Sequence, residues 1–457
     1  MSWTPSIPEG DAPIYERLTQ ALAADIASGA LAAGERLPPQ RDLAFRLGLG
    51  VGTVTRAYAE AERRGLLAGH VGRGSFVAPP RNTAGGGAAM VDMARNLPPA
   101  GPAAARLAPA MARLARRRDL SARLGYPPSG GFEADRAAGA LWLGHVAGWD
   151  GLDPARVICT AGAQQAVAVA LAAVCRPGEA IVAEGASFSG LKGLAAELGY
   201  RLVPAGLDGE GLTPEALDRA AAESGARAAY VLPTHNPTGR VMGARRRAEI
   251  AAVARARGLT LIEDDLYGGY ATDLGLPPLA RLAPERVFHA TSLSKTVSPG
   301  LRAGYLVAPE GREAHEAALG ALHAFALGAP GFGFSLASQW IEDGAAQAIL
   351  DENRAEMAAR VALALAVLGP AMEQPAARAS LHVWLPMSEI AAERAAARAL
   401  RAGVEVTPPR EMILDAAAIS GLRLCLGPAP DRAALGRALE QVKAALGDAA
   451  EARRDIV

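Results

Sequence analysis

Apolar residues recur at helical spacing through the first 78 residues of the chain. A stretch that begins at PIYERLTQ carries an apolar side chain at every fourth position and stops at Gly29. Two further amphipathic helices are expected, one after Pro38-Pro39 and one over VGTVTRAYAEAERRGLL. The positions predicted to face inward are Ile14, Leu18, Leu22, Ile26, Leu43, Leu47, Val54, Tyr58 and Ala61. The segment GHVGRGSFVAPP then predicts a hairpin that turns over residues 72–74. Three short helices and a small β-wing indicate a winged helix-turn-helix, whose third helix can enter a DNA major groove.

The periodic pattern breaks at APPRNTAGGGAAM, which contains prolines and three consecutive glycines. We therefore expect a flexible linker over residues 79–90, between a domain over 1–78 and a domain over 91–457. In the larger domain, apolar runs such as ARVICT, AAYVLPT and LTLIEDD alternate with alanine-rich helical stretches. This alternation predicts an α/β domain with a largely parallel sheet.

The composition is that of an ordinary globular protein. Half of the 457 residues are hydrophobic, 21% are charged, and the formal net charge is zero, so overall charge gives no argument for binding a polyanion. We find no apolar run of transmembrane length and no signal-peptide pattern at the start of the sequence. The spacing of Cys159, Cys175 and Cys425 is typical of neither a disulfide nor a metal site. We therefore expect a cytoplasmic protein with no metal site and no membrane association.

The amphipathic pattern of the N-terminal unit would also fit a small helical docking module. The sequence GERLPPQRDLAFRLGLGVGTVTRAY, followed by RGLL and GRGSFV, resembles the DNA-binding domain of GntR-type regulators over its whole length. The resemblance implies that double-stranded operator DNA is contacted from the two helices and from the wing. The implied contact residues are Arg41, Thr53, Thr55, Arg56, Arg73 and Gly74.

Two features of this unit depart from that resemblance. Residues 1–78 contain eight arginines and no lysine against eight acidic residues, so DNA binding would depend on a local cluster of arginines. Gly50 and Gly52 occupy positions where relatives usually carry Ser, Thr, Asn or Arg, and they offer no side-chain contact to DNA.

Lysine is rare in this chain, because 44 of the 47 basic residues are arginines. Lys295 lies in TSLSKTVSPGLRAGYLV, between hydroxyl-bearing residues and seven positions before Arg302. A lone lysine after a strand is usually a solvated surface residue. Here the hydroxyls and the guanidinium suit a phosphate dianion, and an ε-amine, unlike a guanidinium, can attack a carbonyl. The combination suggests a Schiff base to pyridoxal 5′-phosphate (PLP).

This pattern resembles the fold-type I aminotransferases, and their other motifs follow in order. The resemblance implies a large α/β domain with a smaller C-terminal α/β subdomain. It implies that the turn Ala161–Ala163, with Gly162 at its centre, meets the cofactor phosphate together with Ser292, Ser294 and Arg302. Phe188 would stack on the pyridine ring, although it could also be an ordinary core residue.

The remaining cofactor residues also come from that resemblance. Asn236 of HNPTGR and Tyr267 would hydrogen-bond the phenolic oxygen, and Asp264 would keep the pyridine nitrogen protonated. Asp265 is expected to point the other way, because successive strand residues alternate between the two faces. Arg423 of GLRLCLG would grip a substrate or effector carboxylate, or else be a surface arginine.

Tyr126 of LGYPPSGG would reach the cofactor phosphate of a partner subunit, which implies a homodimer. The segment that follows departs from relatives, which usually carry a Leu-Arg pair there.

A GntR-type winged helix joined to an aminotransferase-like domain is the layout of the MocR subfamily of bacterial regulators. The resemblance implies a transcriptional regulator that senses PLP, or an amino acid or amine that reacts with it. The alternative is a working aminotransferase whose DNA-binding domain is accessory. The sequence HNPTG favours this alternative, because it is closer to that of catalytic aminotransferases than to that of many regulators of the group.

Overall fold

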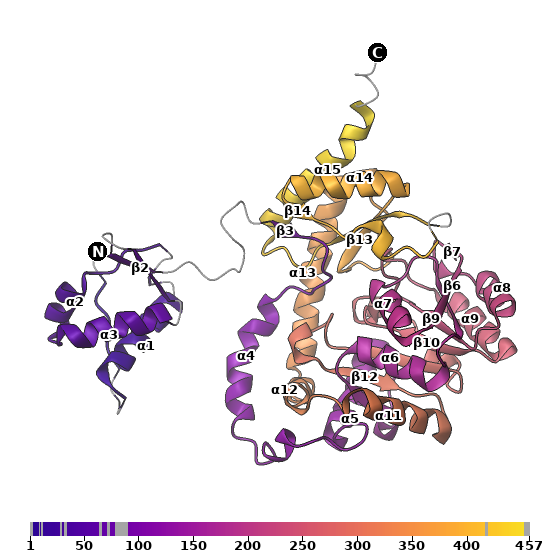
Figure 1. Cartoon of the computed structure of the whole chain (residues 1–457), viewed down its shortest axis with the longest axis horizontal. Coiled ribbons are helices and arrows are strands. Elements are labelled where there is room, and N and C mark those ends of the chain that lie inside the picture. Colours follow the sequence, from indigo (N-terminus) through magenta and orange to yellow (C-terminus); the bar gives the residue numbers. More distant parts are fainter. Residues whose placement is uncertain are drawn as a thin grey trace. The chain divides into compact units, whose positions relative to one another are not determined.

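The computed structural model describes residues 3–8, 10, 12–27, 30–31, 34–63, 66–70, 74–77, 90–415 and 419–451. The chain divides into two compact units, Met1–Ala89 and Met90–Val457 (Figure 1). Apart from residue 90, the predicted linker lies outside the described residues. Within the described residues, no helix combines the length and the apolar character that a membrane span requires.

The first unit is a three-helix core with a two-stranded wing, as the apolar pattern predicted. Its elements are α1 Ile14–Ala27, α2 Gln40–Leu47, α3 Val51–Arg63, β1 Leu67–His70 and β2 Gly74–Val77. The strands pair antiparallel, from Leu67 opposite Val77 to His70 opposite Gly74.

Most of the side chains predicted to face inward in this unit are buried. Those with almost no exposure are Leu18, Leu22, Leu43, Val54, Tyr58 and Ala61. Ile26 and Leu47 are half-buried against them, whereas Ile14 is 40% exposed because it lies in the first turn of α1. The Tyr58 hydroxyl donates to the Pro38 carbonyl at 2.9 Å, which ties α3 to the segment before α2. Helix α2 ends at Gly48, whose φ of +63° permits the left-handed turn that separates it from α3.

The second unit is built on a seven-stranded sheet in the order β4-β12-β11-β10-β9-β5-β6. All neighbours pair in parallel except β12, which is antiparallel to both β11 and β4. The strands are β4 Val157–Thr160, β5 Ala180–Glu184, β6 Arg201–Ala205, β9 Ala228–Val231, β10 Thr260–Asp264, β11 Val287–Ser292 and β12 Gly304–Val307. The predicted α/β architecture with a largely parallel sheet is confirmed.

Alternation along the strands divides the core of this unit into two layers. On β5, for example, Ile181 and Ala183 face one apolar cluster and Val182 faces the other. Helices α6 Ala163–Val174, α7 Ser189–Leu198 and α11 Arg312–Ala326 cover the first face. The opposite face is covered by α5 Glu133–Ala147, α8 Pro214–Ser224, α9 Ala244–Arg257, α10 Leu279–Leu282 and α12 Gly331–Glu342.

The C-terminal part forms the smaller α/β subdomain that was expected (Figure 1). Its elements are β13 His382–Pro386, α14 Glu389–Arg401, β14 Val404–Glu405, β15 Gly421–Cys425 and α15 Arg432–Glu451. The 24-residue helix α13 Ala345–Leu368 leads into it, and β3 Val91–Asp92 joins it by pairing in parallel with β14. The remaining elements are α4 Gly101–Leu114, the strand pair β7 Leu207–Asp208 and β8 Gly211–Leu212, and the 3-10 turns η1 Ala122–Leu124, η2 Pro154–Arg156, η3 Gly268–Tyr270, η4 Thr272–Leu274, η5 Pro299–Leu301, η6 Gly369–Ala371 and η7 Pro409–Glu411.

Candidate functional site

A cavity of about 170 Å³ lies where the parallel strands of the large sheet end. Carboxyl ends of parallel strands are the usual place for ligands in open α/β sheets. Eight residues predicted from the sequence line this cavity, namely Ala163, Phe188, Asn236, Asp264, Tyr267, Ser294, Lys295 and Arg302. They are far apart in the sequence, and the fold brings them to one place.

Asp264, the last residue of β10, presents a carboxyl group that is only partly satisfied. The Tyr230 hydroxyl of β9 donates to Oδ2, whereas Oδ1 is buried without a hydrogen-bond partner. Burial raises the pKa of Asp264 to about 7, although the bond from Tyr230 opposes the shift. A buried, unpartnered carboxylate oxygen in a cavity is an acceptor that a cationic N–H group would complete.

Asp265 takes the opposite orientation and does not line this cavity. It lines a separate pocket together with Thr234 and Arg247.

Lys295 follows β11 and is largely buried in the same cavity. Its Nζ donates to the backbone carbonyl of Asn96 at 2.6 Å. Burial lowers the pKa of Lys295 to about 8, and the nearby guanidinium of Arg423 acts in the same direction. A lysine with this pKa has about a tenth of its amine neutral at pH 7, far more than a lysine of ordinary pKa, and the neutral amine is the form that attacks a carbonyl.

Tyr267 is held by two amide side chains. Asn236 Nδ2 donates to its hydroxyl at 3.3 Å, and Asn96 Nδ2 donates at 3.1 Å. Burial raises the pKa of Tyr267 well above its usual value, so the phenol remains a neutral donor. The His382 ring, whose pKa burial lowers to about 3, packs edge-on at 5.3 Å between centroids.

The opposite end of the cavity has the character of an anion site. Gly162 precedes α6 with a φ of +89°, and a Cβ there would lie 2.8 Å from Arg302 Nη2. Arg302 itself, at a φ of +50°, donates from Nη2 to the Ala161 carbonyl at 2.7 Å. The N-terminus of α6 and this guanidinium therefore face the same space.

The two predicted serines differ in position. Ser294 lines the cavity, whereas Ser292 lies behind it with 1% exposure. Their hydroxyl oxygens are 2.6 Å apart. Ser292 therefore orients Ser294 by a hydrogen bond, and only Ser294 is open to a ligand.

The Phe188 ring occupies a place that depends on a neighbouring glycine. It stands at the start of α7 and is half-buried in the cavity wall. A Cβ on Gly190 would approach its ring to 2.3 Å. Any larger residue at position 190 would displace the ring.

Arg423 on β15 is buried, with 6% exposure, so it is not the surface arginine of the alternative interpretation. Nη1 donates to Asn236 Oδ1 at 2.9 Å, and Nη2 donates to the Ala94 carbonyl at 2.7 Å and to Thr407 Oγ1 at 2.9 Å. Nε is buried without a partner. The guanidinium is therefore tied to Asn236, the residue that holds Tyr267.

Tyr126 is remote from these groups in the single chain. Its side chain is 83% exposed and does not line the cavity.

Three residues at the site were missed by sequence reasoning. Asn96 and Tyr230 stand in no recognisable motif, and Gln164 is simply the second residue of α6. The only signal for Tyr230 was a hydroxyl inside an otherwise apolar strand run, AAYVL.

The predicted DNA contacts in the described part of the first unit lie on α2, α3 and the wing. Arg41, Thr55, Arg56 and Gly74 are exposed and Thr53 is half-buried, while Arg73 lies outside the described residues. Thr55 Oγ1 donates to Gln40 Oε1 at 2.7 Å, so α2 and α3 are linked at this surface. The Arg56 guanidinium stacks 4.3 Å from the centroid of the Tyr15 ring.

The three cysteines are free and buried, so none forms a disulfide. Burial removes each thiol from water and so raises its pKa. Among the described residues, no group of three or more His, Cys, Asp or Glu side chains is arranged to hold a metal ion.

Comparison with known sequences identifies both units. The family of bacterial regulatory proteins called gntR matches residues 14–77, and the family aminotransferase class I and II matches residues 89–442. The HTH-type transcriptional regulator YdeF of Bacillus subtilis is 32% identical over 329 residues, covering 68% of this chain and 68% of that protein. The pyridoxine biosynthesis transcriptional regulator PdxR of Corynebacterium glutamicum is 29% identical over 316 residues, covering 66% of this chain and 67% of PdxR.

Among solved structures, LysN of Thermus thermophilus is similar in fold. It is an α-aminoadipate aminotransferase solved with N-(5′-phosphopyridoxyl)-L-leucine, and it aligns with a TM-score of 0.68 at 24% identity. The alignment covers 79% of this chain and 93% of LysN. By its match over residues 89–442 the chain belongs to the aminotransferase class I and II family, and with its gntR-family N-terminal domain it has the two-domain layout of the MocR subfamily of transcriptional regulators.

Proposed function

We propose that the large domain binds PLP through Lys295 and that this binding controls the attachment of the N-terminal domain to an operator. The observation that carries the proposal is that Lys295, whose pKa burial lowers, and Asp264, whose Oδ1 has no partner, line the same cavity. These are the two groups that a pyridine aldehyde needs, one for its carbonyl carbon and one for its ring nitrogen. We place the domain boundaries at residues 1–78 and 91–457, joined by a linker over 79–90.

Each group in the cavity has a role in holding such a cofactor. Asp264 would accept from the ring N–H, Asn236 and Tyr267 would bond the phenolic oxygen, and Phe188 would cover one face of the ring. The α6 N-terminus at Gly162 and Ala163, with Ser294 and Arg302, would bind the phosphate.

When it is bound, PLP supplies a reactive carbonyl and an electron sink. The protein groups keep that chemistry ordered. Tyr230 holds the Asp264 carboxyl, and Asn96 fixes both the Tyr267 hydroxyl and, through its carbonyl, the Lys295 amine.

The effector that we propose is an amino acid or an amine that reaches this cavity. Arg423 supports a carboxylate-bearing effector, because its guanidinium is buried and bonded to Asn236 Oδ1. A bound carboxylate would compete with Asn236 Oδ1 for the Arg423 guanidinium. It would thereby shift Asn236 and alter its hydrogen bond to the Tyr267 hydroxyl. The relative PdxR is named for control of pyridoxine biosynthesis, which supports a link to this vitamin.

The DNA site that we propose comprises Arg41 on α2, Thr53, Thr55 and Arg56 on α3, and Arg73 and Gly74 at the wing. Gly74 has a φ of +103°, and the Arg36 guanidinium lies within 3.3 Å of the position of a Cβ there. With eight arginines against eight acidic residues over 1–78, affinity would arise from this local cluster and not from net charge.

A homodimer in the cytoplasm is part of the same proposal. The exposed Tyr126 is available to a second subunit, and an operator target requires access to chromosomal DNA. Dimers bind two half-sites whose spacing mirrors the symmetry of the protein.

A gel-shift titration with the DNA upstream of the protein's own gene tests the proposal. We expect sequence-preferred binding whose affinity changes about 5- to 150-fold on addition of PLP or of an amino acid to the PLP-loaded protein. Absence of preferred binding, or binding that is indifferent to both additions, would refute it.

The second candidate function is transamination. The completeness of the cavity favours it, because Lys295, Asp264 and Asn236 are all present together. Steady-state assays with amino-acid and 2-oxo-acid pairs separate the two functions. Rapid turnover by a protein with no preferred DNA binding would make catalysis the main role.

A further inference from the structure

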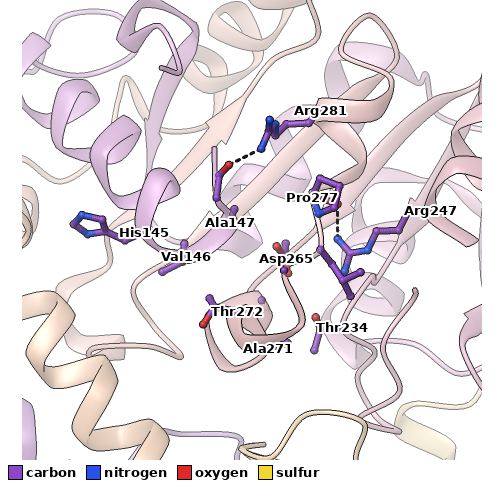
Figure 2. A pocket seen from close by; sticks show the side chains of 14 residues that line it. His145, Val146, Ala147, Thr234, Arg247, Asp265, Ala271, Thr272, Pro277 and Arg281 are labelled. Carbon is purple, nitrogen blue, oxygen red and sulfur yellow. Dashed lines mark hydrogen bonds between the residues drawn. The ribbon is translucent and has the colours of Figure 1, made fainter. Parts of the chain in front are cut away.

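The large domain contains a second cavity, with a volume of about 230 Å³, beside the one that holds Lys295. Figure 2 shows Asp265 in its wall, with Arg247 and Pro277 on one side and Thr272 on the other. The walls come from the end of α5, from α9, and from the turns η3 and η4 after β10. A water molecule takes up roughly 30 Å³ in the liquid, so the space is several times larger than one structural water needs.

Two buried polar atoms in this cavity have no partner. Asp265 Oδ1 and Thr234 Oγ1 are both unsatisfied, and each side chain is 8% exposed. Leaving such atoms unpaired away from water costs free energy, so native structures nearly always supply a partner. Both carboxyl oxygens of Asp265 lie close to Gly268, where a Cβ would be 2.5 Å from Oδ2 and 2.6 Å from Oδ1, and the Gly268 backbone N–H stabilises the carboxylate.

A buried cation shares the same cavity with Asp265. Arg247 is 4% exposed, and its Nε and Nη1 donate to the carbonyls of Met242 and Pro277 at 3.0 and 2.9 Å. Burial raises the pKa of Asp265, and the charges of His289 and, to a lesser degree, Arg247 oppose that shift. Among the described residues, no salt bridge joins Asp265 to Arg247. The Asp265 carboxylate and the Arg247 guanidinium thus line the same cavity without forming a salt bridge to each other.

We propose that this cavity binds a small zwitterionic amino acid, with the ammonium group at Asp265 and Thr234 and the carboxylate at Arg247. An amine alone would satisfy Asp265 but leave the charge of Arg247 without an anionic partner, and a simple carboxylate would do the reverse. A zwitterion of a few carbons completes both, and the volume of the cavity suits that size.

The Asp265 cavity and the Lys295 cavity are lined by neighbouring residues of the same chain segments. Asp264 and Asp265 are consecutive but line different cavities, and so do Asn236 and Thr234 two residues apart. A ligand that shifts Asp265 and Thr234 therefore moves the backbone that carries Asp264 and Asn236. The binding step stands independently of the proposed PLP function, whereas this coupling rests on it.

Calorimetric titration of the full-length protein with β-alanine tests the proposal. The protein is used without added PLP and again after loading with PLP and borohydride reduction, so that the amine cannot react at Lys295. We expect saturable binding of β-alanine in both forms, with weaker binding of ethylamine or propionate.

Variants assign that binding to this cavity. Asp265→Asn keeps the shape but removes the charge, and it should weaken β-alanine binding about tenfold or more. Thr234→Val should weaken it to a lesser degree and serves as the second probe if Asp265→Asn fails to fold. Asp273→Asn is the matched control, because Asp273 is an exposed acid beside the cavity wall and does not line it.

The outcomes are distinct. Absence of saturable binding, or binding that Asp265→Asn and Thr234→Val leave unchanged, would overturn the proposal. Binding that Lys295→Ala abolishes would assign β-alanine to the other cavity and overturn it as well. Failure of the PLP proposal would appear differently, as protein that gains no visible absorbance band with PLP while β-alanine binding persists.

Discussion

Removing the Tyr230 hydroxyl tests the electrostatics of the proposed cofactor site. In Tyr230→Phe, Asp264 Oδ2 loses its donor, and both carboxyl oxygens of this buried group are then without a side-chain partner. A hydrogen bond to a charged group contributes about 1.5–3 kcal/mol. At about 1.36 kcal/mol per pKa unit, its loss should raise the pKa of Asp264 by about one to two units.

The sign of the effect on cofactor binding follows from that shift. The pKa of Asp264 is already about 7, so a further rise leaves the carboxyl mostly protonated at neutral pH. A protonated carboxyl cannot pair with a pyridinium, and the ionised fraction at pH 7 falls from about one half, so we expect PLP affinity at that pH to fall about five- to fiftyfold. The loss should shrink as the pH rises above the new pKa, because the carboxylate is then restored.

The assay is a titration with PLP, followed by absorbance, from about pH 6.5 to about pH 9.5. Lys295 also titrates in this range, so the informative quantity is the ratio of the variant and wild-type dissociation constants at each pH. Tyr305→Phe is the matched control, because that hydroxyl is equally buried but has no hydrogen-bond partner. A ratio within about twofold of one at every pH, or an equal effect of Tyr305→Phe, would refute the reasoning.

Three more predictions separate the roles of the cofactor site and the DNA-binding domain. Lys295→Ala should abolish the visible absorbance band that borohydride removes, while circular dichroism stays unchanged and DNA is still bound, with an affinity that an amino-acid effector no longer changes; retention of the band would remove Lys295 from the site. Asp264→Ala should weaken PLP binding more than Asp265→Ala, because only Asp264 lines the Lys295 cavity; equal or reversed effects would show that the wrong carboxylate was chosen. Arg41→Ala should abolish operator binding in a gel shift and leave PLP absorbance untouched, and retained binding would exclude this contact.

The spacing of apolar residues predicted the helices of the first unit because the side chains on one face of each helix must be buried. The inward face of α1, α2 and α3 follows from side chains such as Leu18, Leu43 and Val54, which have almost no exposure. Ile14 fits the same spacing but is 40% exposed, at the first residue of α1. The pattern specifies a face, and tertiary packing decides how far along the helix that face is covered.

Sequence motifs predicted those site residues that stand in a short, recognisable segment of the chain. Lys295, Arg302 and Asp264 each stand in a short segment with a recognisable sequence, and all three line one cavity. Ser292 was grouped with Ser294, but only the geometry of the strand end shows that Ser292 acts through its neighbour.

Residues that act at a distance could not be predicted in this way. Asn96 lies 171 positions before Tyr267, and no local pattern connects them. Tyr230 is an aromatic residue in a buried strand, which is the ordinary composition of a sheet core. Its function comes from the register of β9 beside β10, where Ile262 lies opposite Tyr230 and Asp264 follows two residues later.

Strand alternation explains why the two cavities belong together. The sequence predicted that Asp264 and Asp265 point in opposite directions, and the structure adds that each direction leads into an open space. The second space was not predictable, because its wall depends on Arg247 of α9 and on Pro277, which meet through a single hydrogen bond. The two residues are joined by one peptide bond, so a backbone shift at Asp265 is passed directly to Asp264. A ligand at Asp265 would therefore be felt at the group that we propose to hold the pyridine nitrogen, with no need for a longer path between the sites.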